Sequence, residues 1–302
     1  MYFEIKQLRH FVSVVETGNI TRAAELQHIT QPALTRSVRN MEERIGGDLL
    51  NRQHHSITPT EAGEVLYQYA KLIIRQAELA ISDVKAISKG HKGHVHVGIA
   101  ALFAPTLAGA LASHLAKVFP ELQVRLTEGF FEDLVAQLHN GEIDVLLSNF
   151  PPGEVPPEVT LKPLFEIRTE FVVSADHPLA SVEQPSLAEM HKARWAIVKH
   201  PHITNFLNSY FAAESLPPLD VAVETTSLVS LKSLVTTGEY IAMLPHRWIK
   251  DELAAGTLTT LRTALVREAG LIVRPDETLR PTVINIIPEV ERACVEWAAD
   301  RQ

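Results

Sequence analysis

Polar and cationic side chains gather in one short stretch of the chain, residues 31–39, which has a proline near its start. Proline is tolerated in the first turn of a helix, because the N–H groups there have no intrahelical partner. Pro32 therefore predicts that a new helix begins at Thr30 or Gln31, after a tight turn. Threonine, glutamine and arginine on the outer side of such a helix have the chemistry to reach base edges and phosphates in a major groove.

Two further helices are expected before this one. The first ends at Gly18, and the second is capped by Thr21. A turn at residues 28–30 separates the second helix from the third, which ends at Gly46. The residues expected to be buried in the three helices are Leu8, Phe11, Val12, Val15, Ala23, Ala24, Leu26, Leu34, Val38, Met41 and Ile45. A solvated helical hairpin inside a bundle is the alternative, which the exposed Thr and Arg after a tight turn disfavour.

A short hairpin is expected after the third helix, at residues 49–63, with a new helix opening at residues 58–60. Arg52, His54 and His55 would lie on this wing, beside a sugar-phosphate backbone.

The formal net charge of −8 over 302 residues argues against a nucleic-acid partner for the chain as a whole. Residues 1–60, however, hold seven Lys or Arg and six Asp or Glu, a balance of +1, so the remainder carries −9. A less acidic N-terminal part on a larger acidic body suits a small DNA-reading module.

The chain has a single cysteine, Cys294, which excludes an intrachain disulfide and is consistent with a reducing compartment. We expect it to be a small buried hydrophobe rather than a nucleophile. Neither a secretion signal nor an apolar stretch long enough to span a bilayer is recognisable, so a cytoplasmic protein without a membrane partner is predicted.

One long run of the sequence resembles a known family. LRHFVSVVETGNITRAAELQHITQPALTRSVRNMEERIGGDLLNR, with SITPTEAG after it, is similar to the winged helix-turn-helix of LysR-type transcriptional regulators. The resemblance covers the N-terminal residues up to Gly63 and implies double-stranded promoter DNA as a partner. The positions that would face DNA are Thr21, Arg22, Gln31, Pro32, Ala33, Thr35, Arg36 and Arg39, with Arg52 and Thr58 on the wing.

A long helix is predicted from Thr60 to about Ile87, because neither proline nor glycine occurs there after Gly63. Its apolar residues alternate spacings of four and three, as in the seam of a two-stranded coiled coil. The seam residues are Leu66, Ala70, Ile73, Ala77, Ala80, Val84 and Ile87. A helix packed on its own domain is the alternative. The LysR resemblance also implies paired linker helices, in a homodimer or homotetramer.

The segment KGHKGHVHVG breaks that helix and introduces a strand. His91, His94 and His96 have the chemistry of metal ligands, but no acidic or thiol residue stands near them in the sequence. We therefore expect a polar hinge with His94 and His96 on an edge strand, and neither a metal ion nor a cofactor.

Short apolar runs alternate with helices from His94 onward. VHVGI, LQVRLTE and DVLLSNF predict a β-α-β-α-β unit with parallel strands and right-handed crossovers. RWAIVKH, DVAVE and YIAMLP predict a second such unit, and a further strand follows Leu265, before a helix from Pro281 to near Ala299. The two halves resemble the periplasmic-binding-protein-like effector domain of the LysR family.

The predicted fold class is α/β, with an N-terminal all-α winged helix-turn-helix and a two-subdomain periplasmic-binding-protein-like effector domain. The predicted boundaries are 1–60 for the DNA-binding domain, 61–89 for the linker (dimerisation) helix and 90–302 for the effector-binding domain. The subdomains of the latter are expected at about 90–165 plus 266–302, and at 166–265.

Ligands of open α/β sheets bind outside the carboxyl ends of the strands, in the crevice between two halves. This rule selects an apolar, partly aromatic set in the first half. In the second half it selects hydroxyls and imidazoles at helix starts, where N–H groups favour an anion. The selected residues are Ala100, Ala101, Leu102, Phe103, Phe130, Asn149, Phe150, His200, Pro201, His202, Ile203, Thr204, Thr226 and Ser227. We predict a small effector with an apolar or aromatic body and one acidic group. Core packing is an equal alternative for Ala100, Ala101 and Leu102.

These observations leave three functions of different classes open. The favoured one is a regulator whose promoter binding is modulated by the effector. An α/β enzyme is disfavoured, because the sequence contains no Gly-rich phosphate loop, no G-x-S-x-G elbow and no His/Glu metal pair at helical spacing. The third is a constitutive DNA-binding dimer with no ligand.

Overall fold

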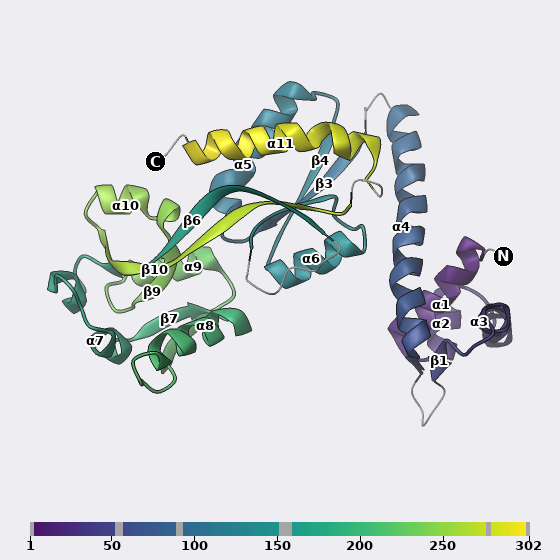
Figure 1. The fold of residues 1–302 in the computed structure, drawn as a ribbon, viewed down its shortest axis with the longest axis horizontal. Helices are drawn as coiled ribbons and strands as arrows, with labels where there is room; N and C mark the ends of the chain where they lie inside the picture. Colours follow the sequence, from purple (N-terminus) through teal and green to yellow (C-terminus); the bar gives the residue numbers. More distant parts are fainter. Residues whose placement is uncertain (1–2, 52–56, 89–92, 151–158, 276–278, 300–302) are drawn as a thin grey trace. The chain divides into compact units, whose positions relative to one another are not determined.

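A computed structural model describes residues 3–51, 57–88, 93–150, 159–275 and 279–299 of the chain (Figure 1). The chain divides into two compact units. The first holds residues 1–96 with the short segments 121–125 and 135–144, and the second holds residues 97–120, 126–134 and 145–302. Each unit has hydrophobic core residues of its own.

The first unit begins with three helices, α1 (Ile5–Thr17), α2 (Ile20–Leu26) and α3 (Gln31–Ile45). Gly18 and Gly46 close α1 and α3 in the left-handed conformation that glycine adopts without strain, with φ of 61° and 80°. Pro32 lies in the first turn of α3. These three predictions of helix ends are confirmed.

The prediction that Thr21 caps α2 was wrong. Asn19 is the capping residue: its Oδ1 accepts hydrogen bonds from the backbone N–H groups of Thr21 and Arg22, at 2.9 and 3.1 Å. An asparagine one residue before the helix satisfies two N–H groups that lack intrahelical partners. The side chains of Thr21 and Arg22 therefore remain available at the surface.

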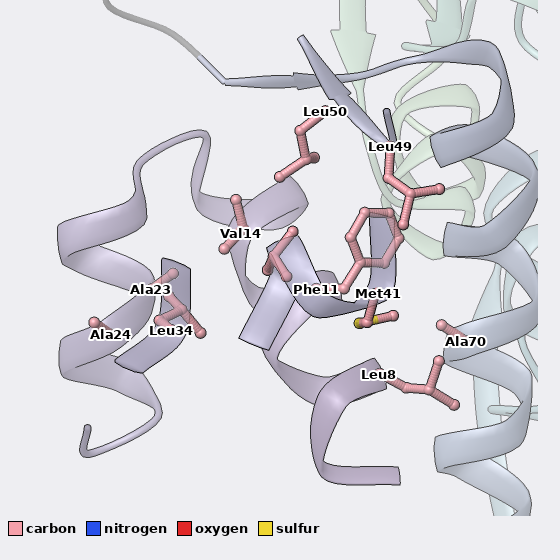
Figure 2. Close-up of a cluster of buried hydrophobic side chains, with 11 residues drawn as sticks. Leu8, Phe11, Val14, Ala23, Ala24, Leu34, Met41, Leu49, Leu50 and Ala70 are labelled. Carbon is pink, nitrogen blue, oxygen red and sulfur yellow. The ribbon is translucent and has the colours of Figure 1, made fainter. Parts of the chain in front are cut away.

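The apolar faces of the three helices meet in one core, to which the wing and the next helix also contribute (Figure 2). Its residues are Leu8, Phe11, Val14, Ala23, Ala24, Leu34, Val38, Met41, Leu49, Leu50 and Ala70. The predictions for Leu26 and Ile45 were wrong, since these side chains are 59% and 46% exposed. Each is the last residue of its helix, and residues further along the chain, Ile29 and Leu49, pack on the core instead.

The wing consists of β1 (Leu50–Asn51) and β2 (Thr58–Pro59), which pair antiparallel with Leu50 opposite Pro59. The predicted hairpin is thus confirmed. Behind it, a Cβ atom on Gly63 would lie 2.0 Å from the carbonyl oxygen of Leu49. Glycine at this position lets the first turn of the following helix touch the backbone at the start of the wing.

Helix α4 (Glu61–Ser88) confirms the predicted long helix, but not the whole of its seam. Leu66 and Ala70 pack on the core of the first unit, because α1 lies against this part of α4. The large apolar side chains that α4 exposes are Val65, Tyr69, Ile73, Ile81 and Val84, of which Ile73 and Val84 were predicted for the seam. The side chain of Ile87 lies outside the described residues.

A six-stranded sheet has the order β4-β3-β5-β10-β6-β9. Its strands are β3 (His94–Ala100), β4 (Gln123–Gly129), β5 (Val145–Asn149), β6 (Thr160–Ser174), β9 (Ala242–Pro245) and β10 (Leu258–Val273). The predicted parallel pairing holds for β3 and β5, but β10 joins β5 and β6 antiparallel, so the sheet is mixed. The long strands β6 and β10 pair over their whole length, from Thr160 opposite Val273 to Ser174 opposite Leu258 (Figure 1).

Strand β3 lies between β4 and β5, so the expectation of an edge strand at His94 and His96 was wrong. The backbone N–H of His96 donates to Oδ2 of Asp144 at 2.9 Å, which ties β3 to the start of β5. Desolvation lowers the pKa of His96. No group of three or more His, Cys, Asp or Glu residues suited to a metal ion occurs among the described residues, and His91 lies outside them.

The second predicted unit is present in part: β7 (Trp195–Val198) and β8 (Val221–Thr225) pair parallel, whereas β9 belongs to the six-stranded sheet, and a parallel bridge between Trp195 and Ile241 joins the two sheets. The helices that connect or cover the strands are α5 (Ala104–Val118), α6 (Phe131–His139), α7 (Leu187–Lys192), α8 (Pro201–Ala212), α9 (Leu228–Val235), α10 (Lys250–Ala254) and α11 (Pro281–Ala299). Two 3₁₀ turns complete the description, η1 (Pro178–Ser181) and η2 (His246–Trp248).

Candidate nucleic-acid interface and ligand pocket

The outer face of α3 presents the predicted polar residues to solvent. Of these residues, Gln31, Pro32, Ala33, Arg36 and Arg39 are exposed, and Thr35 is half-buried. The helix buries its opposite face, with Leu34, Val38 and Met41 in the core (Figure 2). The side chains that could read DNA therefore occupy the face that the fold leaves open.

Two neighbouring side chains of this face are held in a defined orientation. The hydroxyl of Thr35 donates to the backbone oxygen of Gln31 at 3.0 Å, and Nε2 of Gln31 donates to the Thr35 hydroxyl oxygen at 3.1 Å. Preorganised amide and hydroxyl groups one turn apart are suited to hydrogen bonding with base edges.

The two arginines of the face differ in their partners. Arg36 makes no ion pair with any described residue. Nε of Arg39 lies 3.1 Å from Oε1 of Glu43, and both side chains are well exposed. An exposed pair of this kind contributes little stability, about 0.3–0.5 kcal/mol. Arg39 can therefore exchange Glu43 for a phosphate at small cost.

The remaining predicted DNA-facing residues flank this helix. Thr21 and Arg22 are exposed in the first turn of α2, and Thr58 is exposed on β2. Arg52 lies outside the described residues, as do His54 and His55. Where the structure describes them, none of the predicted residues is buried.

Two buried polar residues that support the interface were not predicted. Nδ1 of His10 lies 2.8 Å from the hydroxyl of Ser37, joining α1 to α3. Burial, and secondarily the charge of Lys6, lower the pKa of His10. Oε1 of Glu42 accepts the backbone N–H groups of Leu49 and Leu50 at 3.1 and 3.3 Å, so it anchors the wing to α3.

The sequence held a signal for Glu42. It follows Val38 by four residues and therefore belongs to the inner face of the third helix. A carboxylate there needs buried donors, and the backbone at the start of the wing supplies them.

The second unit contains a cavity of about 620 Å³. It lies at the carboxyl ends of β3, β5 and β7 and at the starts of α6, α8 and α9, as the rule for open α/β sheets predicts. Its volume is within the usual range for small-molecule sites, about 300–1,000 Å³.

Some of the residues predicted to bind the effector line this cavity. The predicted residues that line it are Ala100, Ala101, Leu102, Phe130, Asn149, His200, His202 and Ile203. Phe103, Phe150, Pro201, Thr204, Thr226 and Ser227 are not among the lining residues. Phe103 is buried edge-on against Phe165 and Trp297, and Ser227 caps α9 by accepting the N–H of Ser230.

The long strands β6 and β10 contribute lining residues that were not predicted. Ile167 stands opposite Arg267, and Thr169 stands opposite Leu265, so the two pairs present a mixed apolar and polar wall. Further unpredicted lining residues are Gly129, Phe131, Glu132, Ile197, Val198, Asn205, Phe206, Leu207, Ser209, Leu228, Leu231, Met243 and Pro245. Arg267 makes no ion pair within the described part of the chain.

The polar end of the cavity is formed by one carboxylate and two imidazoles. Oε1 of Glu132 lies 2.9 Å from Nε2 of His202, and Oε2 of Glu132 lies 3.2 Å from Nε2 of His200. The ring of Phe130 stacks on the ring of His200, with centroids 4.2 Å apart. Charged and hydrogen-bonding groups therefore concentrate at the starts of α6 and α8, while the rest of the wall is mostly apolar.

An exposed helix-turn-helix face and a hollow α/β unit on one chain define a one-component transcription regulator, in which the DNA reader and a ligand-binding body are covalently joined. Family models agree with both parts. Residues 5–64 match the bacterial regulatory helix-turn-helix protein, lysR family, and residues 88–294 match the LysR substrate binding domain. The chain belongs to the LysR family of DNA-binding transcriptional regulators.

The sequence similarity to individual relatives covers most of the chain. A nitrogen assimilation regulatory protein, nac, of Escherichia coli K12 is 31% identical over 249 residues, covering 80% of this chain and 78% of that protein. A hydrogen peroxide-inducible genes activator of Dickeya chrysanthemi is 26% identical over 280 residues, 91% of each protein.

Solved structures share the fold. ArgP from Mycobacterium tuberculosis superposes with a TM-score of 0.70 at 19% identity and covers 97% of both chains. Full-length CbnR complexed with its target DNA superposes with a TM-score of 0.62 at 21% identity, covering 96% of this chain and 100% of CbnR.

Proposed function

We propose that this regulator reads promoter DNA with α3 and that an anionic small molecule with an apolar or aromatic body, bound in the cavity of the second unit, modulates that reading. The observation that carries the proposal is the combination of a mostly apolar cavity with Arg267, His200 and His202 in its wall. A few polar groups in an apolar cavity fix the orientation of a small ligand.

DNA reading by α3 is supported by the exposure of its polar face, with Arg36 outside any ion pair among the described residues. Arg or Lys contacts to guanine edges are the commonest specific contacts in a major groove. Arg22, Arg39 and Arg52 are proposed to contact phosphates, which position a protein on the duplex without reading its sequence.

Control by the ligand requires a state of the protein that the ligand prefers, since equal affinity for two states shifts neither. We propose that subunits pair through α4 as homodimers or homotetramers, because five large apolar side chains of that helix are exposed. Ligand binding would then change the placement of two DNA-reading helices.

The proposed role is binding without turnover, with no cofactor, and its place is the cytoplasm. Within the described residues, no helix combines the length and the apolar character that a bilayer crossing needs.

Peroxide sensing by thiols, suggested by the name of one relative, is not proposed for this chain. Cys294 is the single cysteine of the sequence, and it is buried in α11. Burial, together with the charge of Glu291, raises the pKa of its thiol to about 12. Because the thiolate is the reactive form, we expect peroxide treatment to leave DNA binding unchanged, with Cys294→Ser behaving as the wild type. A peroxide response that dithiothreitol reverses and Cys294→Ser abolishes would contradict this.

The ligand proposal is tested by calorimetric titration of the purified full chain with benzoate, benzyl alcohol and glucose. Saturable binding of benzoate, lost in Arg267→Met and kept in Arg262→Met, is the expected result. Arg262 is an exposed arginine of the same strand that does not line the cavity, so it controls for the change in charge. Binding of glucose or benzyl alcohol but not of benzoate would reject an anionic ligand, and binding of none would favour a constitutive DNA-binding protein.

A further inference from the structure

Glu132 holds a position in the cavity that a ligand carboxylate could also hold. Its two oxygens lie beside two separate imidazole nitrogens, Nε2 of His202 at 2.9 Å and Nε2 of His200 at 3.2 Å. The imidazole rings are roughly parallel, with an interplanar angle of 28° and centroids 5.5 Å apart. Two imidazole nitrogens close to one carboxylate make an anion-binding arrangement, although Oε2 of Glu132, which is buried, accepts no hydrogen bond from a described residue and has His200 only at ion-pair distance.

The surroundings of this arrangement add to its preference for an anion. His200 is the residue before the first turn of α8, a helix of 12 residues, and no side chain caps that helix. The partial positive charge of a helix N-terminus favours a nearby carboxylate. Phe130 stacks on His200 and holds the plane of its ring.

Glu132 itself comes from a different part of the fold. It lies in the first turn of α6, whereas both histidines belong to the start of α8. Its side chain is 38% exposed, and that of His200 is 16% exposed. Glu132 can therefore swing toward solvent, while the ring of His200 stays in place.

We infer that the carboxylate of Glu132 occupies the anion subsite of the ligand-free protein as an internal substitute, and that a ligand binds by placing its own carboxylate between His200 and His202 and displacing Glu132. This inference rests on the proposed function, because it takes the cavity to be the ligand site. It names the ligand as a carboxylate rather than any anion, since the two imidazole nitrogens lie beside the two oxygens of one planar group.

An amine ligand that binds directly to Glu132 is the opposite possibility. It is disfavoured because Oε1 of Glu132 already lies 2.9 Å from Nε2 of His202, so an ammonium group would find only Oε2 without a hydrogen-bond partner among the described residues. Arg267 in the wall of the same cavity adds a further positive charge.

The two possibilities predict opposite effects of neutralising Glu132. Removing an internal competitor frees the imidazole nitrogens and removes a repulsive charge. Glu132→Gln and Glu132→Ala should therefore bind benzoate about three- to tenfold more tightly than the wild type, the size expected for one net hydrogen bond. If Glu132 instead bound an amine ligand directly, the same substitutions would weaken the binding of benzylamine.

The experiment is calorimetric titration of the full chain with benzoate and with benzylamine. The variants are Glu132→Gln, Glu132→Ala, the double variant His200→Ala/His202→Ala, and Asp133→Asn as control. Asp133 is exposed beside Glu132 in the same turn of α6 but does not line the cavity, so it reports the effect of net charge alone. Thermal unfolding of each variant verifies that it is folded.

Tighter benzoate binding in both Glu132 variants, loss of it in the double histidine variant and no change in Asp133→Asn are the expected results. Weaker or unchanged benzoate binding in the Glu132 variants overturns the inference while the wild-type affinity for benzoate still supports the proposed function. The inference is also overturned if the wild type binds benzylamine and Glu132→Gln does not. If neither the wild type nor any variant binds benzoate, the proposal of a carboxylate ligand is wrong, and so is the proposed function.

Discussion

The DNA-facing surface and the ligand cavity are built in opposite ways. Most of the surface comes from one short part of the chain, Thr21 to Arg39, with Thr58 added from the wing, and the opposite face of its main helix, α3, is core. The cavity draws residues from Ala100 to Arg267, on three strands of one half, strands of the other half and the starts of three helices. A local pattern is sufficient to define the first, whereas long-range strand pairing defines the second.

Each unit has a glycine at which an added Cβ atom would overlap a backbone oxygen, so a single methyl group should damage one unit and spare the other. The largest effect is expected for Gly63→Ala, because the added Cβ would lie 2.0 Å from the backbone oxygen of Leu49. We expect a loss of about 3 kcal/mol in the free energy of unfolding of the first unit, and loss of DNA binding. Benzoate titration and DNA-binding assays on the same sample measure the two units separately.

The control is Gly109→Ala. A Cβ atom there meets nothing within 4 Å, and the residue lies in α5, so this variant should be neutral or slightly stabilising. Unchanged DNA binding in Gly63→Ala would show that the close contact between α4 and the wing is not required.

The corresponding substitution in the second unit is Gly270→Ala. Its Cβ would lie 2.1 Å from the backbone oxygen of Lys162, at an irregularity in the pairing of β6 and β10. Because both strands line the cavity, we expect ligand binding to be lost with about 1–3 kcal/mol of stability, while an isolated DNA fragment is still bound. Ligand affinity equal to the wild type would contradict the role given to these strands.

Within the DNA-facing surface, Arg36 and Arg52 should separate sequence reading from backbone binding. Arg36→Ala is expected to lose about 1–3 kcal/mol on the preferred sequence and little on random DNA. Arg52→Ala should weaken all sequences alike and reduce the dependence of binding on salt. Fluorescence titrations at several salt concentrations measure both. Arg194→Ala, an exposed arginine of the second unit, is the control, and equal sequence-blind losses in Arg36→Ala and Arg52→Ala would refute the assignment.

The smallest effect concerns pH. Burial lowers the pKa of His10, so the unfolded chain binds this proton more readily than the folded chain. The contribution to stability is therefore complete above the ordinary histidine pKa of about 6.5 and declines as the pH falls below it. Thermal unfolding of wild type and His10→Gln from neutral to acidic pH should show a shallower decline in the variant. His28→Gln, in an exposed turn, is the control, and identical slopes in wild type and His10→Gln would contradict the cause.

Prediction from the sequence succeeded for local features of the helices and was less complete for features that depend on distant parts of the chain. Gly18, Pro32 and Gly46 mark helix ends through local backbone chemistry, and the structure has those ends. The errors at Leu26 and Ile45 arose where periodicity was extended to the last residue of a helix, although burial there depends on the path of the next segment. The cap at Asn19 was missed because asparagine, like threonine, is a good capping residue and stands two positions earlier.

The lining residues at the strand ends of the cavity were predicted, whereas those contributed by β6 and β10 were not. Asn149 and Ala100 follow from the rule for carboxyl ends of strands, since that rule needs only the order of elements. Ile167 and Arg267 line the cavity because β6 and β10 pair in one particular register, and a shift of one residue would turn both away. Glu132 was missed for a related reason: its histidine partners lie on an element that is distant in the chain.

The central claim is that the exposed face of α3 reads DNA sequence. Its most direct test is sequencing of the genomic fragments that the purified protein retains, for the wild type and for Arg36→Ala. We predict that the wild type enriches a motif with two related half-sites, and that Arg36→Ala retains fragments without it. An identical motif in both, or no motif with the wild type, would contradict the claim.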